Sequence, residues 1–421
     1  MRKLTILCAV VAALGLSASG SVSAAPAPNA LSEDAAALAD ATGLSLANAT
    51  AQLERQAVLG DVLSNLRMSP EVGDRIIEGR LSGRDDGASL GLTLIVSSDT
   101  DGAIRSSVNE QLDALGLVGS AVTIEELGIT PEEIRDRQDA VRSAVMNAVG
   151  DRAERFYFNA QFSLSGELSA FETDDVDAAH KLLAGSDFAE VPLVPVEGYR
   201  DEGYIVAGNG VLQYAGSSII GRCTAGFTIS DVRNGQTVKG VLTAGHCNHE
   251  ANWTHVGATY WTPPTGTYQV YEGNESPATN RTHDVGEVWL VNSSDHSAVY
   301  PQFWTGSQFR NVTSIEPDAG HAIDAFVCAY GNKSTSTKCG WIYKSSNFDP
   351  DGFFLSTWLT TDDAVSVTKA SGTSETGDSG GPWWNGNEAF GIHSGSAAGR
   401  WIYTKVDGPA SGFLGVTVLE N

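Results

Sequence analysis

The chain has 421 residues, of which 42% are hydrophobic and 18% are charged, and its formal net charge at pH 7 is −25. This length suits two or three domains, and the composition is that of a globular protein. The negative charge argues against nucleic acid as a partner, because a phosphate-binding surface needs an excess of lysine and arginine.

The first residues have the pattern of an export signal. Arg2 and Lys3 precede an apolar run over residues 4–16, and small residues at 22–24 fit a cleavage site before Ala25. The run is too short to span a bilayer, and no later stretch is long enough either. We therefore expect a signal peptide at 1–24, a secreted, extracellular protein and no membrane partner.

Residues 25–200 alternate helix-like and strand-like patterns and predict an α+β region. An acidic first turn near residue 33 begins a helix rich in alanine and leucine, and residues 89–96 alternate as a half-buried strand does. Pro131 begins another helix, two strands follow within 158–171, and a further helix begins at Asp175. Residues 191–210 carry prolines, glycines and acids without periodicity, and we expect a linker there.

From about residue 211 the pattern changes to short strands bounded by Gly, Asn, Asp, Ser and Thr. This rhythm is typical of an all-β domain, which we expect to occupy residues 211–421.

Four cysteines remain once the export signal, which contains Cys8, is removed: Cys223, Cys247, Cys328 and Cys339. An oxidising compartment and an even number favour two disulfides. The sequence permits three pairings, and short loops favour 223–247 with 328–339. The spacing is not that of a zinc site, so we expect structural bridges and no metal.

A candidate nucleophile lies in the segment 377–382, which has the sequence GDSGGP. Flanking glycines allow a sharp turn that leaves the hydroxyl of Ser379 uncovered, although a glycine-rich hairpin with an incidental serine has the same composition. The segment also fits the GxSxG elbow of α/β-hydrolases. That fold needs a parallel sheet and a downstream histidine, whereas the surroundings here are all-β and only His393 follows.

A candidate base and its orienting acid come from two other segments. An apolar strand leads through the sequence TAGHC (residues 243–247) to His246, beside a cysteine that can fix the turn. Asp284 enters an apolar strand, as a buried orienting carboxylate should, and Asp295 and Asp324 are its rivals.

With TAGHC and GDSGGP in this order, and with GRCTAGF at 221–227, the second half of the chain resembles the chymotrypsin-like serine proteases. The resemblance is closest to the secreted bacterial branch of streptogrisins and α-lytic protease. It implies two six-stranded antiparallel β-barrels, the disulfides Cys223–Cys247 and Cys328–Cys339, and peptide hydrolysis through an acyl-enzyme without a cofactor. The implied roles are His246 as base, Asp284 as orienting acid, Ser379 as nucleophile, and the backbone N–H groups of Gly377 and Ser379 as the oxyanion hole.

The same branch carries N-terminal pro-regions that help the protease fold and inhibit it. Residues 25–200 resemble such a pro-region in size and α+β character, and the alternative is an independent binding domain that the mature protein keeps. One departure is that many relatives have a third disulfide around the serine loop, whereas this chain has no cysteine after Cys339.

Substrate preference is expected from the residues that match the specificity pocket of the family. The floor position falls near Thr373, which is not acidic, so cleavage after Arg or Lys is not expected. His393 precedes the substrate-pairing segment 394–396, and this arrangement resembles the glutamate-specific members. The expected substrate-binding residues are Thr376, His393, Ser394, Gly395 and Ser396.

Alternatives to this specificity remain open. His393 can instead pack inside the barrel, with an apolar preference at P1, the substrate residue before the scissile bond. Cleavage after glutamate would permit self-maturation at Glu197-Gly198 or Glu202-Gly203. A catalytically silent relative that serves as a binding module is the rival from another functional class. The remaining histidines, such as His321, lie in polar stretches and are expected at the surface.

Overall fold

The computed structural model describes the chain from residue 30 to its end, with several gaps. The described residues are 30–83, 90–115, 122–149, 158–196, 200–201, 210–215, 218–248, 258–262, 268–275, 284–344, 364–397, 399–408 and 414–421. The expected signal peptide at 1–24 lies outside them. Among the described helices, none is both long and apolar enough to cross a membrane.

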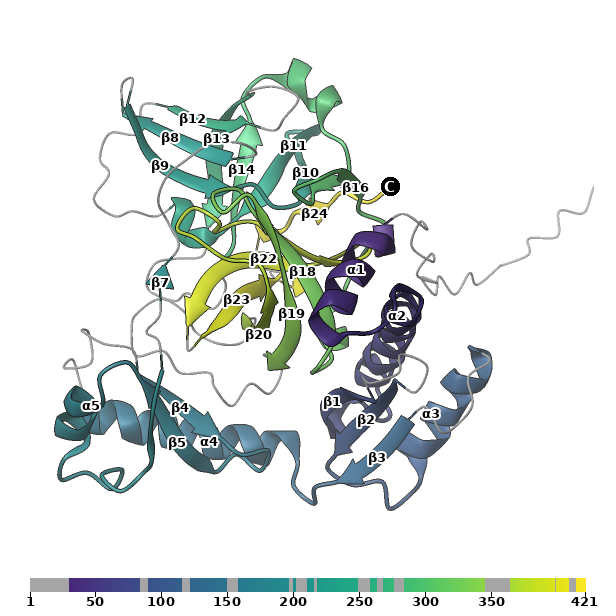
Figure 1. Ribbon diagram of the computed structural model, residues 1–421, viewed down its shortest axis with the longest axis vertical. Helices are drawn as coiled ribbons and strands as arrows, with labels where there is room; N and C mark the ends of the chain where they lie inside the picture. The colour runs from purple at the N-terminus through teal and green to yellow at the C-terminus, as the bar shows by residue number, and fades with distance from the viewer. Residues whose placement is uncertain are drawn as a thin grey trace, which may run out of the picture.

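The first part of the N-terminal region is a helical hairpin followed by a small sheet with a helix (Figure 1). The side chain of Ser45 caps the second helix by accepting a hydrogen bond from the N–H of Asn48. The sheet has the order β1-β2-β3, with β1 and β2 antiparallel and β2 and β3 parallel. The elements are α1 (Ala30–Thr42), α2 (Leu46–Met68), a 3₁₀ helix (Gly73–Arg75), β1 (Ile76–Ser82), β2 (Gly91–Val96), α3 (Ala103–Ala114) and β3 (Val122–Glu126).

The second part of the N-terminal region is a separate small α+β unit with its own core around Phe171. Its first helix begins at the predicted proline, and Thr130 and Glu133 exchange hydrogen bonds there in a capping box. The predicted α+β character is thereby confirmed. The elements are α4 (Pro131–Val149), β4 (Phe158–Phe162), β5 (Leu168–Thr173), α5 (Val176–Leu183) and β6 (Leu193–Pro195).

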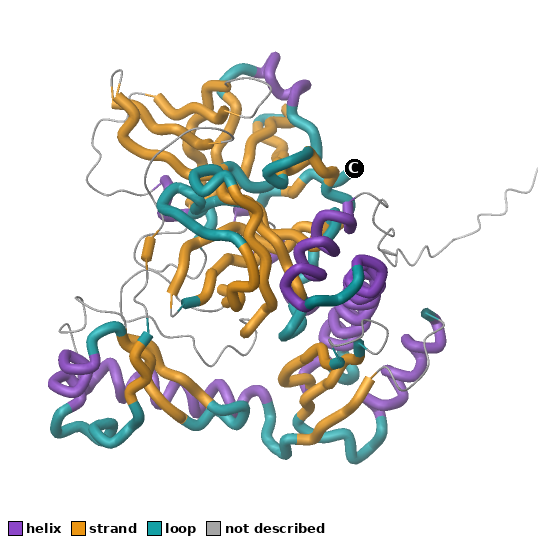
Figure 2. Tube along the Cα trace, in the orientation of Figure 1, coloured by secondary structure: helices purple, strands orange, loops and turns teal. Residues whose placement is uncertain are grey.

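From residue 210 the described chain is built from strands (Figure 2). The first sheet is antiparallel throughout and has the order β24-β10-β11-β14-β13-β12-β8-β9. Its strands are β8 (Gly210–Ala215), β9 (Ser218–Thr224), β10 (Thr228–Arg233), β11 (Gln236–Thr243), β12 (Ala258–Thr262), β13 (Tyr268–Glu275), β14 (Gly286–Leu290) and β24 (Thr417–Val418).

The second sheet closes on itself as a six-stranded barrel. Its strands follow the order β22-β21-β18-β19-β20-β23, and β23 pairs back with β22. The predicted all-β domain of chymotrypsin-like fold is confirmed, and of its two expected six-stranded barrels the described residues close the second. The strands are β18 (Phe326–Gly331), β19 (Ser336–Lys344), β20 (Ala364–Ser371), β21 (Pro382–Asn385), β22 (Glu388–Ala397) and β23 (Arg400–Lys405), with β17 (Ser314–Ile315) and β7 (Arg200–Asp201) pairing β22 and a hairpin of β15 (Gln302–Trp304) and β16 (Phe309–Asn311) beside them.

Helices α1 and α2 pack directly on the second barrel (Figure 1). The carboxylate of Asp34 in α1 forms hydrogen bonds with Arg310, with the indole N–H of Trp384 and with the N–H of Gly386. The side chains of Asp34 and Arg310 are 3% and 2% exposed. This docking site therefore contains a buried ion pair whose partners are 276 residues apart in the chain.

Helix α2 makes the second polar contact between the two regions. The side-chain amide of Gln56 donates to the carbonyl of Phe326 and accepts from its N–H, as a neighbouring strand would. Leucines of α1 and α2 meanwhile share continuous apolar cores with the β region. Helices α1 and α2 are thus an integral part of the same packed structure as the β region.

We expect Asp34→Asn to destabilise the full-length protein by about 3–5 kcal/mol, because it removes the buried anionic partner of Arg310 and leaves this guanidinium only with the partly exposed Glu33. Urea denaturation measures the loss. Asp40→Asn, on an exposed position of the same helix, is the control and should change the free energy of unfolding by less than about 0.5 kcal/mol. Equal effects of the two variants would contradict the assigned role of the buried pair.

Candidate functional site

His246 lies just beyond the end of β11, in a 3₁₀ turn over Gly245–Asn248. The strand before it is buried at Val241 and Leu242, which anchors the turn in the core. A disulfide joins the neighbouring Cys247 to Cys223 at the end of β9. Strand and disulfide together fix the backbone that carries the imidazole.

Asp284 holds His246 at two points. Its Oδ2 lies 2.8 Å from Nδ1 of the imidazole, and its Oδ1 accepts the backbone N–H of His246 at 2.8 Å. The two side chains are 6% and 9% exposed. Because an ionised carboxylate only accepts hydrogen bonds, the neutral imidazole carries its proton on Nδ1 and keeps a lone pair on Nε2 for proton abstraction.

The two rival carboxylates lie elsewhere. Asp295 forms hydrogen bonds with Asn292 and Ser294 in a 3₁₀ turn after β14. Asp324 precedes β18, with a backbone φ of 68° and its N–H bonded to the carbonyl of Ile342. Of the three candidates, Asp284 is therefore the one that the fold brings to His246.

The loop of Ser379 packs against the strands that lead to His246. The carbonyl of Ser379 accepts the N–H of Thr224 at 2.7 Å, and its hydroxyl donates to the carbonyl of Ser394 at 3.5 Å. A side chain at Gly380, whose φ is +90°, would collide with Thr224 and Thr243. Only glycine permits this conformation and this close approach, which joins the serine loop to the His246 segment.

A buried ion pair stabilises the residue before the serine. Asp378 Oδ2 lies 3.2 Å from Nζ of Lys338 in β19, and both side chains are fully buried. Its Oδ1 also accepts the N–H groups of Lys333 and Ser334. Burial alone would raise the pKa of Asp378, but Lys338 and the N–H donors outweigh burial and hold this pKa below its usual value. The carboxylate therefore stays ionised and ties the serine loop to the turn between β18 and β19.

His393 is fully buried and belongs to the same polar network. Its Nδ1 accepts the indole N–H of Trp383 at 3.2 Å, so the neutral ring carries its proton on Nε2, which lies 2.9 Å from Ser374 Oγ. Ser374 in turn accepts from Lys338 and approaches Asp378. The sequence analysis missed Ser374, and Thr373, expected at the pocket floor, is exposed.

The other expected substrate-binding residues surround the serine loop. Thr376 and Ser396 are half-buried, whereas Ser394 and Gly395 are buried in β22. Ser394, Gly395 and Ser396 directly follow His393 in this same strand.

The cysteines form the two expected disulfides, Cys223–Cys247 and Cys328–Cys339. The sulfurs of the first pair lie near the ring of His246. Because both sulfurs are bonded to each other, they offer no thiolate to a metal ion, and this group has a structural role.

Part of this chain is similar to known proteins. No family model matches the chain. Streptogrisin-C of Streptomyces griseus is 26% identical over 207 residues, covering 48% of this chain and 39% of its own length. Over this part, the chain is similar to the chymotrypsin-like serine proteases of the bacterial branch that contains the streptogrisins.

Solved structures of such proteases also resemble part of this chain. Chymotrypsin of Cellulomonas bogoriensis is 22% identical with a TM-score of 0.35, over 52% of this chain and 99% of the other. An α-lytic protease homologue, N4, is 17% identical with a TM-score of 0.34, over 51% and 99%. The chain thus matches less than half the length of Streptogrisin-C but nearly the whole of both solved proteases.

We expect Lys338→Met to destabilise the protein by about 3–5 kcal/mol, because it leaves Asp378 as a charge inside the barrel without its cationic partner. Chemical denaturation measures the effect. Lys333→Met removes a partly exposed lysine 3.8 Å from Glu375 and should cost about 0–1 kcal/mol. A cost for Lys338→Met as small as that of the control would mean that the ion pair does not stabilise the serine loop.

Proposed function

We propose that this protein is a secreted serine endopeptidase in which Ser379 is the nucleophile, His246 the base and Asp284 the orienting acid. The observation that carries the proposal is the two-point hydrogen bonding of Asp284 to His246, next to strands against which the loop of Ser379 packs. The bacterial branch that the chain resembles contains secreted proteases, which supports the location.

The chemistry requires no cofactor or metal. His246 Nε2 takes the hydroxyl proton as Ser379 Oγ attacks the peptide carbonyl, and the same proton then passes to the leaving amine. Asp284 stabilises the imidazolium that forms in between. The N–H groups of Gly377 and Ser379 would donate to the oxyanion, and water releases the acyl group by the reverse sequence.

A serine-directed fluorophosphonate tests this assignment against a catalytically silent binding protein. We expect labelling of processed protein at Ser379 and none in Ser379→Ala. Asp284→Asn should lower kcat by about 10⁴, because the imidazole loses the partner that fixes its tautomer. An unlabelled but folded protein would favour the silent relative.

We infer that residues 25–200 are a pro-region that occupies the substrate site of the domain at 211–421. Strand β7 pairs antiparallel with β22, with Arg200 opposite Ser396 and Asp201 opposite Gly395. This is the segment that matches the substrate-pairing residues of the family. A peptide already bound there would exclude other substrates and would make this region an intramolecular inhibitor.

The register of β7 favours one of the two self-cleavage sites. Asp201 lies opposite Gly395, the residue after Ser394, and the carbonyl of Ser394 accepts the hydroxyl of Ser379. We therefore propose Glu202-Gly203 as the bond cut during maturation. Both this bond and Glu197-Gly198 lie outside the described residues.

We further propose that glutamate is preferred at P1. In support, the indole of Trp383 fixes the tautomer in which His393 Nε2 is a donor, and a buried carboxylate needs such donors. The rival is an apolar preference, with His393 serving only the barrel network. The hydrogen bond between His393 and Ser374 is compatible with both preferences. A glutamate at P1 could replace Ser374 as the partner of His393, or it could bind to the Ser374 hydroxyl itself.

A P1 profile on a peptide library, with sequencing of the mature N-terminus, separates the two preferences. We expect cleavage after Glu and an N-terminus at Gly203. Trp383→Phe keeps the ring but removes the N–H donor, and it should lower kcat/KM for Glu substrates about ten- to hundredfold. Strong cleavage after Phe or Leu with none after Glu would end the proposal.

A further inference from the structure

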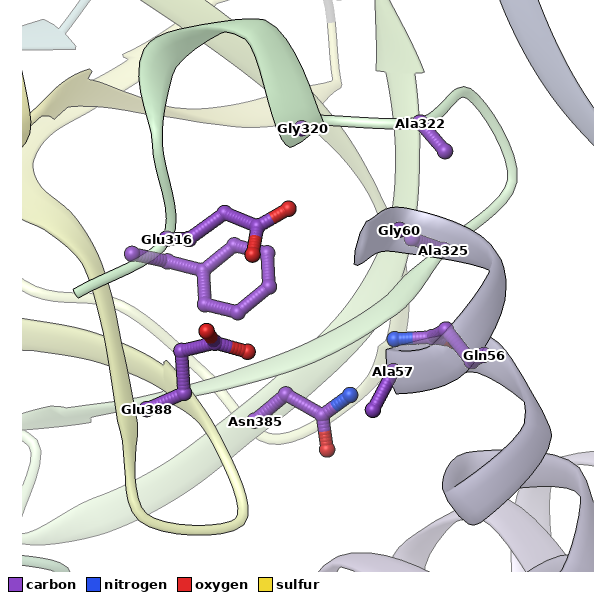
Figure 3. Close-up of a pocket in the computed structure, with 10 residues that line it drawn as sticks. Gln56, Ala57, Gly60, Glu316, Gly320, Ala322, Ala325, Asn385 and Glu388 are labelled. Carbon is purple, nitrogen blue, oxygen red and sulfur yellow. The ribbon is translucent and has the colours of Figure 1, made fainter. Parts of the chain in front are cut away.

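A small cavity lies where helix α2 covers the second barrel (Figure 3). Helix α2 contributes Gln56 and Gly60 to its lining, and the β region contributes Glu316, Asn385 and Glu388. Two acidic side chains of the β region therefore face a helix of the N-terminal region.

Glu316 is covered by the helix. It is 4% exposed, and a methyl group added at Gly60 would lie 3.5 Å from its Oε1. Because Gly60 has no side chain, the backbone of α2 lies next to this carboxyl group. Undocking of α2 would thus expose Glu316 to water.

Glu388 is the second member of the pair. Its Oε1 accepts the hydroxyl of Ser314 at 3.2 Å, and its carboxyl group forms a hydrogen bond with that of Glu316. Asp61 of α2 adds a third negative charge from the other side of the interface. Neighbouring buried carboxyl groups cannot all ionise at low cost, so the pair retains a proton.

The pKa directions agree with this geometry. Burial, together with Glu388 and Asp61, raises the pKa of Glu316 well above its usual value. Burial and Asp61 raise the pKa of Glu388 to about 7. Burial also raises the pKa of Asp61.

The nearby cations do not neutralise the pair. Lys405 attracts Glu316 but donates its hydrogen bond to the carbonyl of Asp318, and its effect is smaller than that of burial. Arg67 of α2 donates to the carbonyl of Ala319. Burial and Lys405 lower the pKa of His321 well below its usual value, so this ring is neutral near pH 7. Tyr403, whose pKa burial raises, is neutral as well.

We propose that the carboxyl pair of Glu316 and Glu388 makes the docking of α2 proton-dependent, so that the N-terminal region is held most tightly in acid and released as the pH rises. The proposal rests on the proposed function, because it treats this region as the removable inhibitor. It adds a regulatory property to the interface between the two parts of the chain.

The sign follows from proton linkage. A carboxyl group whose pKa is higher in the docked state takes up a proton on docking, so docking is favoured fully below the undocked pKa. Glu388 has an ordinary pKa of 4.5 and a docked pKa of about 7, and undocking removes the part of this shift that α2 and its Asp61 cause, so docking weakens as the pH rises toward about 7. For each proton released, the equilibrium constant for undocking rises by up to about tenfold per pH unit over this range.

Hydrogen exchange of the amides of α2 in full-length Ser379→Ala, corrected for the intrinsic pH dependence, measures this equilibrium without any need for catalysis. We expect the opening constant of α2 to rise with pH between about 5 and 7. The double variant Glu316→Gln, Glu388→Gln should reduce the slope, because neither amide titrates. Asp61→Asn, which acts from the helix itself, should shift the rise to lower pH.

Glu71→Gln, at an exposed position after α2, is the matched control and should keep the parent slope. A flat profile in the parent, or an unchanged slope in the double variant, would overturn the proposal. If the double variant does not fold, the test is the pH profile of Asp61→Asn. A rise of its opening constant at the same pH as in the parent would contradict the proposed role of the carboxyl pair. Failure of the proposed protease activity would appear separately, as loss of labelling at Ser379.

Discussion

The buried ion pair between Lys338 and Asp378 is the constraint on which the functional site depends. Both side chains are fully buried, and the carboxylate also binds two backbone N–H groups of the turn between β18 and β19. The residue before Ser379 is therefore fixed by the barrel. Charges buried in this way are costly unless they are paired, so the pairing determines one position for the loop.

The same ion pair connects the loop of Ser379 to His393. Ser374 accepts from Lys338 and lies within hydrogen-bond distance of His393, whose other nitrogen accepts from Trp383. Because each of these groups has a defined donor or acceptor role, the network specifies one tautomer of the histidine. One network of contacts therefore fixes both the position of the Ser379 loop and the tautomer of His393.

The N-terminal region completes the core of the β region. Leucines of α1 and α2 share apolar cores with strands of the two large sheets, and the carboxylate of Asp34 pairs with the buried guanidinium of Arg310. An antiparallel barrel consists of contacts between distant residues and folds slowly. Helices that form locally and offer a matching apolar face can stabilise such a barrel while it closes, and their removal would expose both charge and apolar surface.

The sequence by itself determined the elements whose signals are local: the proline-initiated helix α4, the alternating strand β2, the switch to short strands after residue 210, and the candidate residues His246, Asp284 and Ser379, which lie in short motifs. Helix α2 was not predicted individually, because its buried face includes the polar or small residues Gln52, Gln56, Gly60 and Ser64, which hide its periodicity. The expectation that His321 lies at the surface was wrong, since it packs against Phe390 and Tyr403. Only the tertiary structure decided which distant charges meet, as with Arg310 and Asp34, Lys338 and Asp378, or Glu316 and α2. Charge pairs of this kind leave no periodic trace in a sequence, because burial, and not spacing along the chain, makes each partner necessary to the other.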